Sequence, residues 1–301
     1  MIRALALLGV VALIGQQPAT PPSAGAPTPP GTDIYELTFS GQVDALKAAA
    51  PQPLSVAKGY DNQPFFTPDG AAVLFTANRD GKQTDIYEFD RSARRVRQLV
   101  ATPEGEYSAT ITPDGKGFSV IRVEADGTQR LWRFDRSGGN PRVVLTDIKP
   151  VGYHAWVDAD RLVLFVLGKP STLQTAQVSG GKGTVVASNV GRSILRVPGG
   201  SAISFVQREE NGEYWVKELN PATAAITPLV LAPAGSAERD CAWLPDGTLL
   251  MSAGTRILAW RRGEKGWRDV YDVAAHKLGE VTRMAVAPDG KSVAIVVNEG
   301  K

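Results

Sequence analysis

Residues 64–75 read PFFTPDGAAVLF and place a Pro-Asp-Gly turn between two apolar runs. Proline fixes φ near the value needed at the second position of a type I turn, aspartate can bond its own backbone, and glycine accepts a positive φ. The tripeptide is therefore a tight hairpin connector. It recurs at Pro113, Pro245 and Pro288, again between runs that suit strands.

The spacing of these turns identifies a repeat. The first two copies are 45 residues apart and the last two are 43 apart, whereas the gap between them is 132 residues, or three times 44. Two degenerate copies fill that gap, which gives turn positions 68, 113, 158, 198, 245 and 288. A period of this length, rich in short strands, is the signature of a β-propeller blade.

Each repeat contains four segments that suit strands. A second turn signal such as Asp80-Gly81 follows the first hairpin, and a third apolar segment such as 85–89 comes after it. A fourth segment, such as 96–100, completes the unit. We therefore predict an all-β fold, a six-bladed β-propeller whose blades are four-stranded and antiparallel.

The two ends of the repeat region complement each other. The last repeat, residues 281–297, holds only the first two strands and leaves an unpaired edge. Residues 33–37 (DIYEL) nearly repeat the third strand at 85–89 (DIYEF), and Leu54 stands where a fourth strand would. We predict that residues 32–57 complete the last blade and close the ring.

The first 31 residues differ in composition from the repeats. A positively charged start at 1–3 precedes 12 uncharged, mostly apolar residues, too few to span a bilayer but suited to a secretory signal. A stretch rich in proline follows. We expect a signal peptide over 1–17, a Pro-rich linker over 18–31 and the propeller over 32–301, with no transmembrane segment after signal cleavage.

Cysteine content and charge restrict location and partners. The single cysteine, Cys241, cannot form an internal disulfide and is interpreted as a buried structural thiol. An export signal without disulfides suits a Gram-negative periplasm, so we expect a periplasmic or secreted monomer. The net charge is +2, from 33 basic and 31 acidic residues, which indicates no nucleic-acid partner.

Residues 59–70 (GYDNQPFFTPDG), followed by NRDG at 78–81 and DIY at 85–87, resemble the WD-like Pro-Asp-Gly repeats of TolB-type propellers. The resemblance covers residues 32–301 and implies a six-bladed propeller, commonly periplasmic, which TolB uses to engage other envelope proteins. TolB carries an additional folded N-terminal domain, whereas only the Pro-rich stretch precedes the ring here. The resemblance is therefore to the propeller of TolB and not to TolB itself.

Few features of the sequence indicate catalysis. It has no Gly-x-Ser-x-Gly nucleophile elbow, no Walker loop and only two histidines, His154 and His276. The best metal cluster would join His154 to Asp158 and Asp160, but these aspartates belong to a turn at the far end of a strand from His154. The sequence therefore predicts no catalytic residue, no metal site and no cofactor.

The fold indicates where a binding site would lie. Loops that enter the first strand of each blade gather around one mouth of the central channel, and here they carry large polar and aromatic side chains. Tyrosine and arginine are favoured at recognition hot spots, although polar loop ends can also be merely solvated. The candidate binding residues are Tyr60, Asn62, Tyr107, Tyr153, His154, Arg192, Arg239 and Arg283.

We expect an exported, non-enzymatic propeller that binds a protein partner in the cell envelope or periplasm. The alternative is a small-molecule or glycan-processing enzyme with its active site in the propeller channel. Carboxylates or histidines clustered inside the channel would favour the enzyme, whereas a broad face rich in tyrosine and arginine would favour the binding protein.

Overall fold

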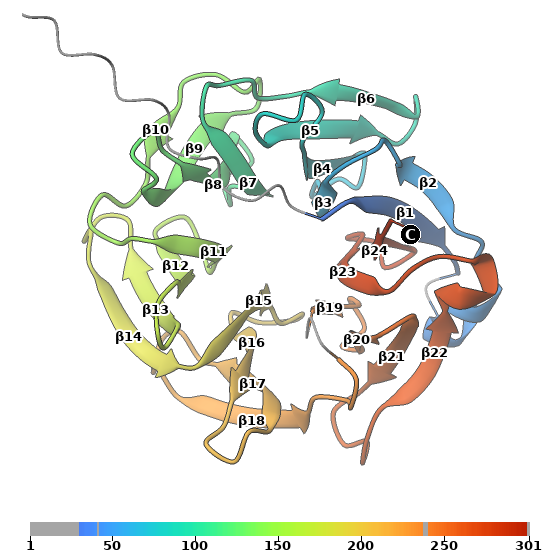
Figure 1. Ribbon diagram of the computed structural model, residues 1–301. Helices are drawn as coiled ribbons and strands as arrows, with labels where there is room; N and C mark the ends of the chain where they lie inside the picture. Colours follow the sequence, from blue (N-terminus) through green and yellow to red (C-terminus); the bar gives the residue numbers. More distant parts are fainter. Residues whose placement is uncertain (1–29, 41, 237–239, 300–301) are drawn as a thin grey trace, which may run out of the picture.

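The computed structural model describes residues 30–40, 42–236 and 240–299. Within these ranges, 24 β-strands form six four-stranded antiparallel sheets, arranged as the blades of a ring around a central opening (Figure 1). The prediction of an all-β, six-bladed propeller is confirmed. The predicted signal peptide, and the linker up to residue 29, lie outside the described residues.

Blades 1 to 3 follow one another along the chain. Blade 1 consists of β3 (Asp61–Phe66), β4 (Ala72–Ala77), β5 (Asp85–Asp90) and β6 (Arg95–Gln98). Blade 2 consists of β7 (Gly105–Ile111), β8 (Gly117–Val123), β9 (Gln129–Asp135) and β10 (Arg142–Val143). Blade 3 consists of β11 (Val151–Trp156), β12 (Arg161–Val166), β13 (Thr172–Gln177) and β14 (Gly183–Ser188).

Blades 4 to 6 complete the ring. Blade 4 consists of β15 (Val190–Arg196), β16 (Ile203–Arg208), β17 (Tyr214–Leu219) and β18 (Ile226–Leu231). Blade 5 consists of β19 (Cys241–Trp243), β20 (Leu249–Ala253), β21 (Arg256–Trp260) and β22 (Arg268–Asp272). Blade 6 has the strand order β2 (Gln52–Ser55), β1 (Thr32–Thr38), β24 (Ser292–Asn298) and β23 (Val281–Val286).

The Pro-Asp-Gly tripeptides lie where the sequence predicts them, between the first two strands of their blades. In blade 2, Gly115 has a φ of +67° and its N–H donates to the Thr112 carbonyl at 2.8 Å. The Asp114 carboxylate accepts hydrogen bonds from the Thr112 hydroxyl at 2.6 Å and from the Lys116 N–H at 3.0 Å. The glycine supplies the positive φ, and the aspartate closes the turn.

The sixth sheet joins strands from both ends of the described chain. β1 pairs with β24 in seven consecutive register positions, from Thr32 opposite Asn298 to Thr38 opposite Ser292. The short 3₁₀ helices η1 (Val43–Ala48) and η2 (Val273–His276) flank this junction in sequence. With β1 on one side and β23 on the other, β24 is an inner strand of its sheet and not an open edge.

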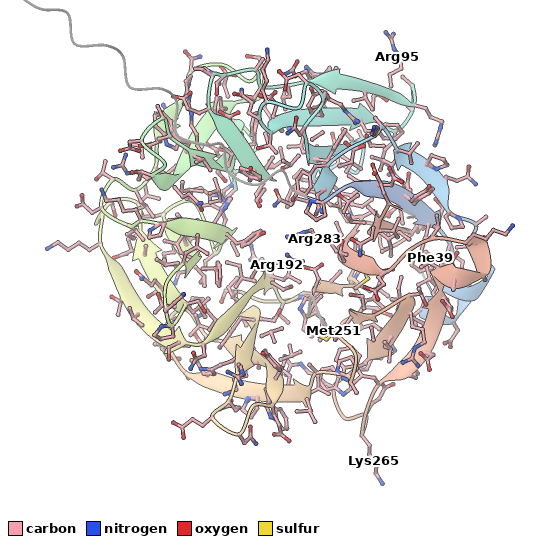
Figure 2. The ribbon with its side chains drawn as sticks, viewed as in Figure 1. Phe39, Arg95, Arg192, Met251, Lys265 and Arg283 are labelled. Atoms are coloured by element: carbon pink, nitrogen blue, oxygen red, sulfur yellow. The ribbon has the colours of Figure 1, made fainter. Side chains whose placement is uncertain are left out.

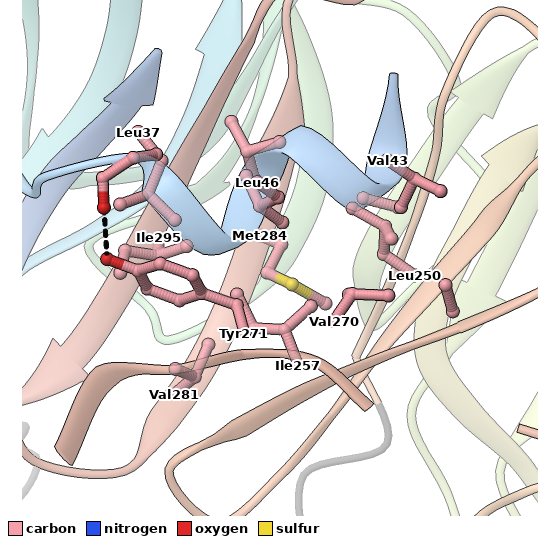
Figure 3. Close-up of a cluster of buried hydrophobic side chains, with 14 of the residues drawn as sticks. Leu37, Val43, Leu46, Leu250, Ile257, Val270, Tyr271, Val281, Met284 and Ile295 are labelled. Atoms are coloured by element: carbon pink, nitrogen blue, oxygen red, sulfur yellow. Dashed lines mark hydrogen bonds between the residues drawn. The ribbon is translucent and has the colours of Figure 1, made fainter. Parts of the chain in front are cut away.

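Hydrophobic side chains fill the spaces between neighbouring blades. Figure 3 shows one such cluster, where Val43 and Leu46 of η1 pack with Leu250, Tyr271 and other side chains of blades 5 and 6. The Tyr271 hydroxyl donates to the Ala49 carbonyl at 2.8 Å (Figure 3). The N-terminal segment is therefore held both by the β1–β24 ladder and by apolar burial against blade 5.

Cys241 is buried at the start of β19, and burial raises the pKa of its thiol well above the usual range.

Across the described ranges, no helix is both long and apolar enough to cross a bilayer.

Candidate functional site

The first strand of each blade lines the central opening. Figure 2 shows the side chains of Arg192, from β15, and Arg283, from β23, reaching into this opening. A cavity of about 110 Å³ lies among the first strands, with Gln63, Ser108, His154, Arg192, Asp240 and Arg283 among its lining residues.

Most of these first strands are irregular where they line the opening. In β3 the register shifts between Asn62 and Phe65, and in β7 it shifts between Tyr107 and Thr110. A β-bulge bends its strand and re-aims the side chains beside it. Gln63 and Ser108 lie within these shifts and have φ values of 57° and 56°, a region that residues other than glycine rarely adopt.

Arg283 connects opposite sides of the opening. Its Nη2 donates to the Tyr153 hydroxyl at 2.9 Å, and its Nη1 lies 3.9 Å from Oδ1 of Asp240. The guanidinium carbon is 5.1 Å from the centroid of the Tyr153 ring. Arg192 Nη2 donates to the carbonyl oxygen of Thr282 at 3.2 Å, which brings the two guanidinium groups to the same part of the channel.

Tyr60 stands among these groups. Burial raises the pKa of its hydroxyl well above the usual range, Tyr153 and Tyr107 add to the rise, and the charges of Arg283 and Arg192 oppose it. The Tyr60 hydroxyl is therefore within electrostatic reach of four side chains from four other blades. Five of the predicted binding residues converge, each from a different blade.

A larger groove adjoins this cluster. It has a volume of about 790 Å³, and Tyr60, Tyr107 and Tyr153 line it together with Lys82 and Gln83 from the loop between β4 and β5. The groove and the small cavity share Gln63 and Tyr153 in their linings, so the two hollows are neighbours. We call the groove, the small cavity and the five converging side chains the channel mouth.

The other predicted binding residues have different positions. Asn62 is buried, its amide donates to the Thr32 hydroxyl at 3.2 Å, and its side-chain oxygen accepts from the Gln63 N–H at 2.8 Å. It joins β3 to β1 and lines neither hollow. Arg239 lies outside the described residues.

His154 is buried in the wall of the small cavity. Its Nε2 lies 2.7 Å from Ser119 Oγ, a distance that a serine nucleophile and its base would have. Burial lowers the pKa of His154 to about 3, so the ring is neutral. The Ser119 hydroxyl also accepts a hydrogen bond from Trp156 Nε1 at 2.8 Å.

The same tryptophan–serine bond recurs without a histidine. Trp243 Nε1 donates to Ser204 Oγ at 2.8 Å, again from a first strand to the second strand of the preceding blade. Ser119 is itself fully buried. We therefore interpret Ser119 as part of an inter-blade bond and not as a nucleophile.

A buried group of charges beside the groove did not emerge from sequence reasoning as a unit. Glu106 is fully buried, and its Oε1 lies 3.4 Å from Nε of Arg122. Arg122 also pairs with Glu104, and its guanidinium carbon lies 4.6 Å from the Trp132 ring centroid. Burial raises the pKa of Glu106 to about 7 and that of Asp85 to about 6.

Sequence reasoning did not join these residues, because they come from β5, β7, β8 and β9 and from the residue before β7, and they meet only in the folded protein. Nowhere in the described part of the chain do three or more His, Cys, Asp or Glu side chains gather in a way that could hold a metal ion.

Comparisons with known proteins place the fold. No protein-family model matches the chain. No curated protein matches it significantly. Among solved structures, a protein assigned as TolB from Agrobacterium tumefaciens is 14% identical with a TM-score of 0.69, and the match covers 90% of this chain and 99% of that one.

Two further structures are similar. TolB from Acinetobacter baumannii is 14% identical with a TM-score of 0.57, over 89% of this chain but only 64% of the longer TolB chain. An oligogalacturonate lyase in complex with manganese is 13% identical with a TM-score of 0.59, over 90% of this chain and 91% of that one. The chain thus has the TolB-like six-bladed β-propeller fold, which binding proteins and enzymes share.

Proposed function

We propose that the protein is an exported, non-enzymatic propeller that binds a protein partner in the cell envelope through the channel mouth. The observation that carries the proposal is the convergence of Tyr60, Tyr107 and Tyr153 with Arg192 and Arg283 beside a groove of about 790 Å³. Tyrosine and arginine provide large contact areas together with directional hydrogen bonds.

The composition of the small cavity favours binding over catalysis. Its described ionisable lining residues include one histidine and one carboxylate, His154 and Asp240. Asp240 already accepts a hydrogen bond from the Met284 N–H at 2.8 Å and lies near Arg283. General acid–base chemistry needs a group whose pKa lies near the working pH, and the pKa of about 3 for His154 does not meet this need.

The alternative is a small-molecule or glycan-processing enzyme with its active site in the channel. The similarity to an oligogalacturonate lyase keeps this alternative open, although at 13% identity it concerns the fold alone. Turnover of oligogalacturonate by the purified protein would support it. Loss of that turnover in His154→Ala, with folding retained, would place the chemistry in the channel.

Export is part of the proposal. A signal peptide over 1–17 would direct export, and the ring would reach the periplasm or the outside as a monomer carrying the Pro-rich linker over 18–31. Pulse labelling of the full chain should show removal of an N-terminal segment together with appearance outside the cytoplasm. A full-length product that stays in the cytoplasm would contradict this part.

A charge-reversal pair tests the binding face. Lys82 is exposed at the groove, whereas Lys116 is exposed in the Pro-Asp-Gly hairpin at the opposite end of the first strands. Proteins that co-purify with the exported wild-type chain should be lost from Lys82→Glu and from Tyr107→Ala but retained by Lys116→Glu. The reverse pattern would place the partner on the other face.

A further inference from the structure

We propose that the small cavity of the channel mouth is a carboxylate-binding site that receives an acidic group from a polypeptide segment lying in the adjacent groove. The choice of a polypeptide rests on the proposed function. The choice of a carboxylate rests on the chemistry of the cavity alone.

The cavity brings two guanidinium groups together. Arg192 reaches the carbonyl oxygen of Thr282, the residue next to Arg283, so the two cations converge from blades 4 and 6. A carboxylate between two guanidinium groups is attracted by both, and arginine offers a planar pair of donors that matches a carboxylate. Among the described lining residues the two arginines face one carboxylate, Asp240, which lies 3.9 Å from Arg283 and also accepts a hydrogen bond from the Met284 N–H.

Three polar atoms of the lining residues have unused hydrogen-bonding capacity. Ser108 Oγ, His154 Nδ1 and Arg283 Nε are buried and have no hydrogen-bond partner within the described ranges. Each such group costs about 1–3 kcal/mol relative to a satisfied one. The serine hydroxyl and the arginine Nε–H are donors, and a bound acceptor could satisfy them after small side-chain rotations. The unmet donors and the positive charge therefore both favour an anion.

The dimensions restrict what can enter. At roughly 30 Å³ for each water in the liquid, a cavity of about 110 Å³ holds a carboxylate and little more. The rest of the ligand has to lie elsewhere, and the groove of about 790 Å³ shares Gln63 and Tyr153 with the cavity. A chain that fills the groove with its body and the cavity with an acidic end or side chain fits both hollows.

The tyrosines support a polypeptide as the body of this ligand. Tyr60, Tyr107 and Tyr153 present rings and hydroxyl groups along one groove, which suits backbone amides and apolar side chains together. Gln63 is already committed, because its side-chain oxygen accepts from the Thr76 hydroxyl at 2.9 Å and from the Ser108 N–H at 2.8 Å. Part of the wall between the two hollows is thus fixed before any ligand arrives.

Matched peptides test the proposal on the mature protein. The signals of the arginine Nε–H groups are followed by NMR during titration with four probes: a seven-residue glycine- and serine-rich peptide with an internal Glu and an amidated end, its Gln counterpart, the Gln counterpart with a free C-terminal carboxylate, and sodium acetate. Signals that disappear in Arg192→Gln and Arg283→Gln identify the two arginines.

The expected result is a saturable shift of the Arg283 signal with one or both carboxylate peptides, and at least about tenfold weaker binding of the neutral Gln peptide, as the loss of a charge-assisted hydrogen bond implies. Whether the internal Glu or the free C-terminus binds more tightly identifies the source of the carboxylate. Arg283→Gln and Arg192→Gln should each weaken the better peptide at least about tenfold. Because Arg283 is largely buried, Tyr153→Phe, which leaves both guanidinium groups in place, serves as a milder variant and should weaken the same peptide by a smaller factor.

If neither carboxylate peptide binds more tightly than the neutral Gln peptide, or if binding is undiminished in all three folded variants, the carboxylate site is overturned. Binding of acetate without binding of either acidic peptide would support the site and contradict a polypeptide ligand, and with it the proposed function. Co-purification that depends on Lys82, without binding of any carboxylate probe, would support the proposed function and contradict the carboxylate site.

Discussion

The Arg283 guanidinium donates a hydrogen bond to the Tyr153 hydroxyl at 2.9 Å, although 130 residues separate the two in sequence. Blades 6 and 3, from which they come, lie on opposite sides of the ring (Figure 1). The bond therefore crosses the central channel and fixes the orientation of a cation that faces the small cavity.

Tyr153→Phe should lower the free energy of unfolding by about 1 kcal/mol, because it removes this bond and leaves the ring in place. Tyr107→Phe is the matched control, since the Tyr107 hydroxyl makes no hydrogen bond to a described residue while its ring lines the same groove. Urea denaturation of both variants measures the difference. Equal unfolding midpoints would show that the bond across the channel contributes nothing to stability.

Glu106→Gln should change how stability depends on pH. The pKa of Glu106 is about 7 in the folded protein against a reference value of 4.5, so the folded state holds more protons between these values. Its contribution is complete below pH 4.5 and is lost as pH rises to about 7. Glutamine does not titrate, so the variant does not lose this stability. Its free energy of unfolding should rise by roughly 1–3 kcal/mol relative to that of wild type between pH 5 and pH 8.

Asp85 and Asp61, each with a pKa raised by burial to about 6, impose a slope of the same sign on both proteins. The informative quantity is therefore the difference between wild type and variant, measured by chemical denaturation across the pH range. A constant difference from pH 4 to pH 8 would mean that Glu106 titrates normally. Because Arg122 keeps its ion pair with Glu104 in the variant, the substitution does not leave this arginine without a carboxylate partner.

Gly115→Val should destabilise blade 2 by more than Gly115→Asn. No atom lies within 4 Å of the place where a Cβ would stand, so the cost arises from the φ of +67° and not from a clash. Asparagine tolerates this region, whereas a β-branched residue is strained there. Thermal melts of the two variants give the comparison, and similar melting temperatures would contradict the turn geometry.

Leu46→Ala should lower the free energy of unfolding, measured by chemical denaturation, by about 2–5 kcal/mol, because Leu46 of η1 is fully buried in the cluster between blades 5 and 6. Val56→Ala is the control, since Val56 belongs to the same N-terminal segment but is 47% exposed.

Deleting residues 32–57 should have a larger effect than Leu46→Ala and abolish cooperative unfolding, because β24 would lose its partner β1. A truncated protein that melts like the intact chain would show that the β1–β24 ladder is dispensable.

The repeat was readable from the sequence because each blade uses the same local chemistry. A turn such as Pro113-Asp114-Gly115 depends on neighbouring residues alone, so its spacing reported both the number of blades and their first hairpins. The tyrosines and arginines at the channel mouth followed from the same symmetry, since equivalent loops of a ring face one opening.

The parts that escaped prediction depend on the register of paired strands and on contacts between blades. The shift in β3 between Asn62 and Phe65 turned Asn62 toward Thr32, and counting residues back from the turn could not reveal this. The pairing of Glu106 with Arg122 needed the folded positions of two strands. Ser119 and His154 likewise meet only because blades 2 and 3 are neighbours.

Site-directed photo-crosslinking in living cells tests the central claim, that the channel mouth is the recognition face, most directly. A photoreactive phenylalanine replaces Tyr107 at the groove in one variant and Lys116 in the opposite hairpin in another. The expected result is an adduct of defined mass at position 107, reduced when Arg283→Gln is added, and no such adduct at position 116. An adduct at position 116 with none at 107 would contradict the claim.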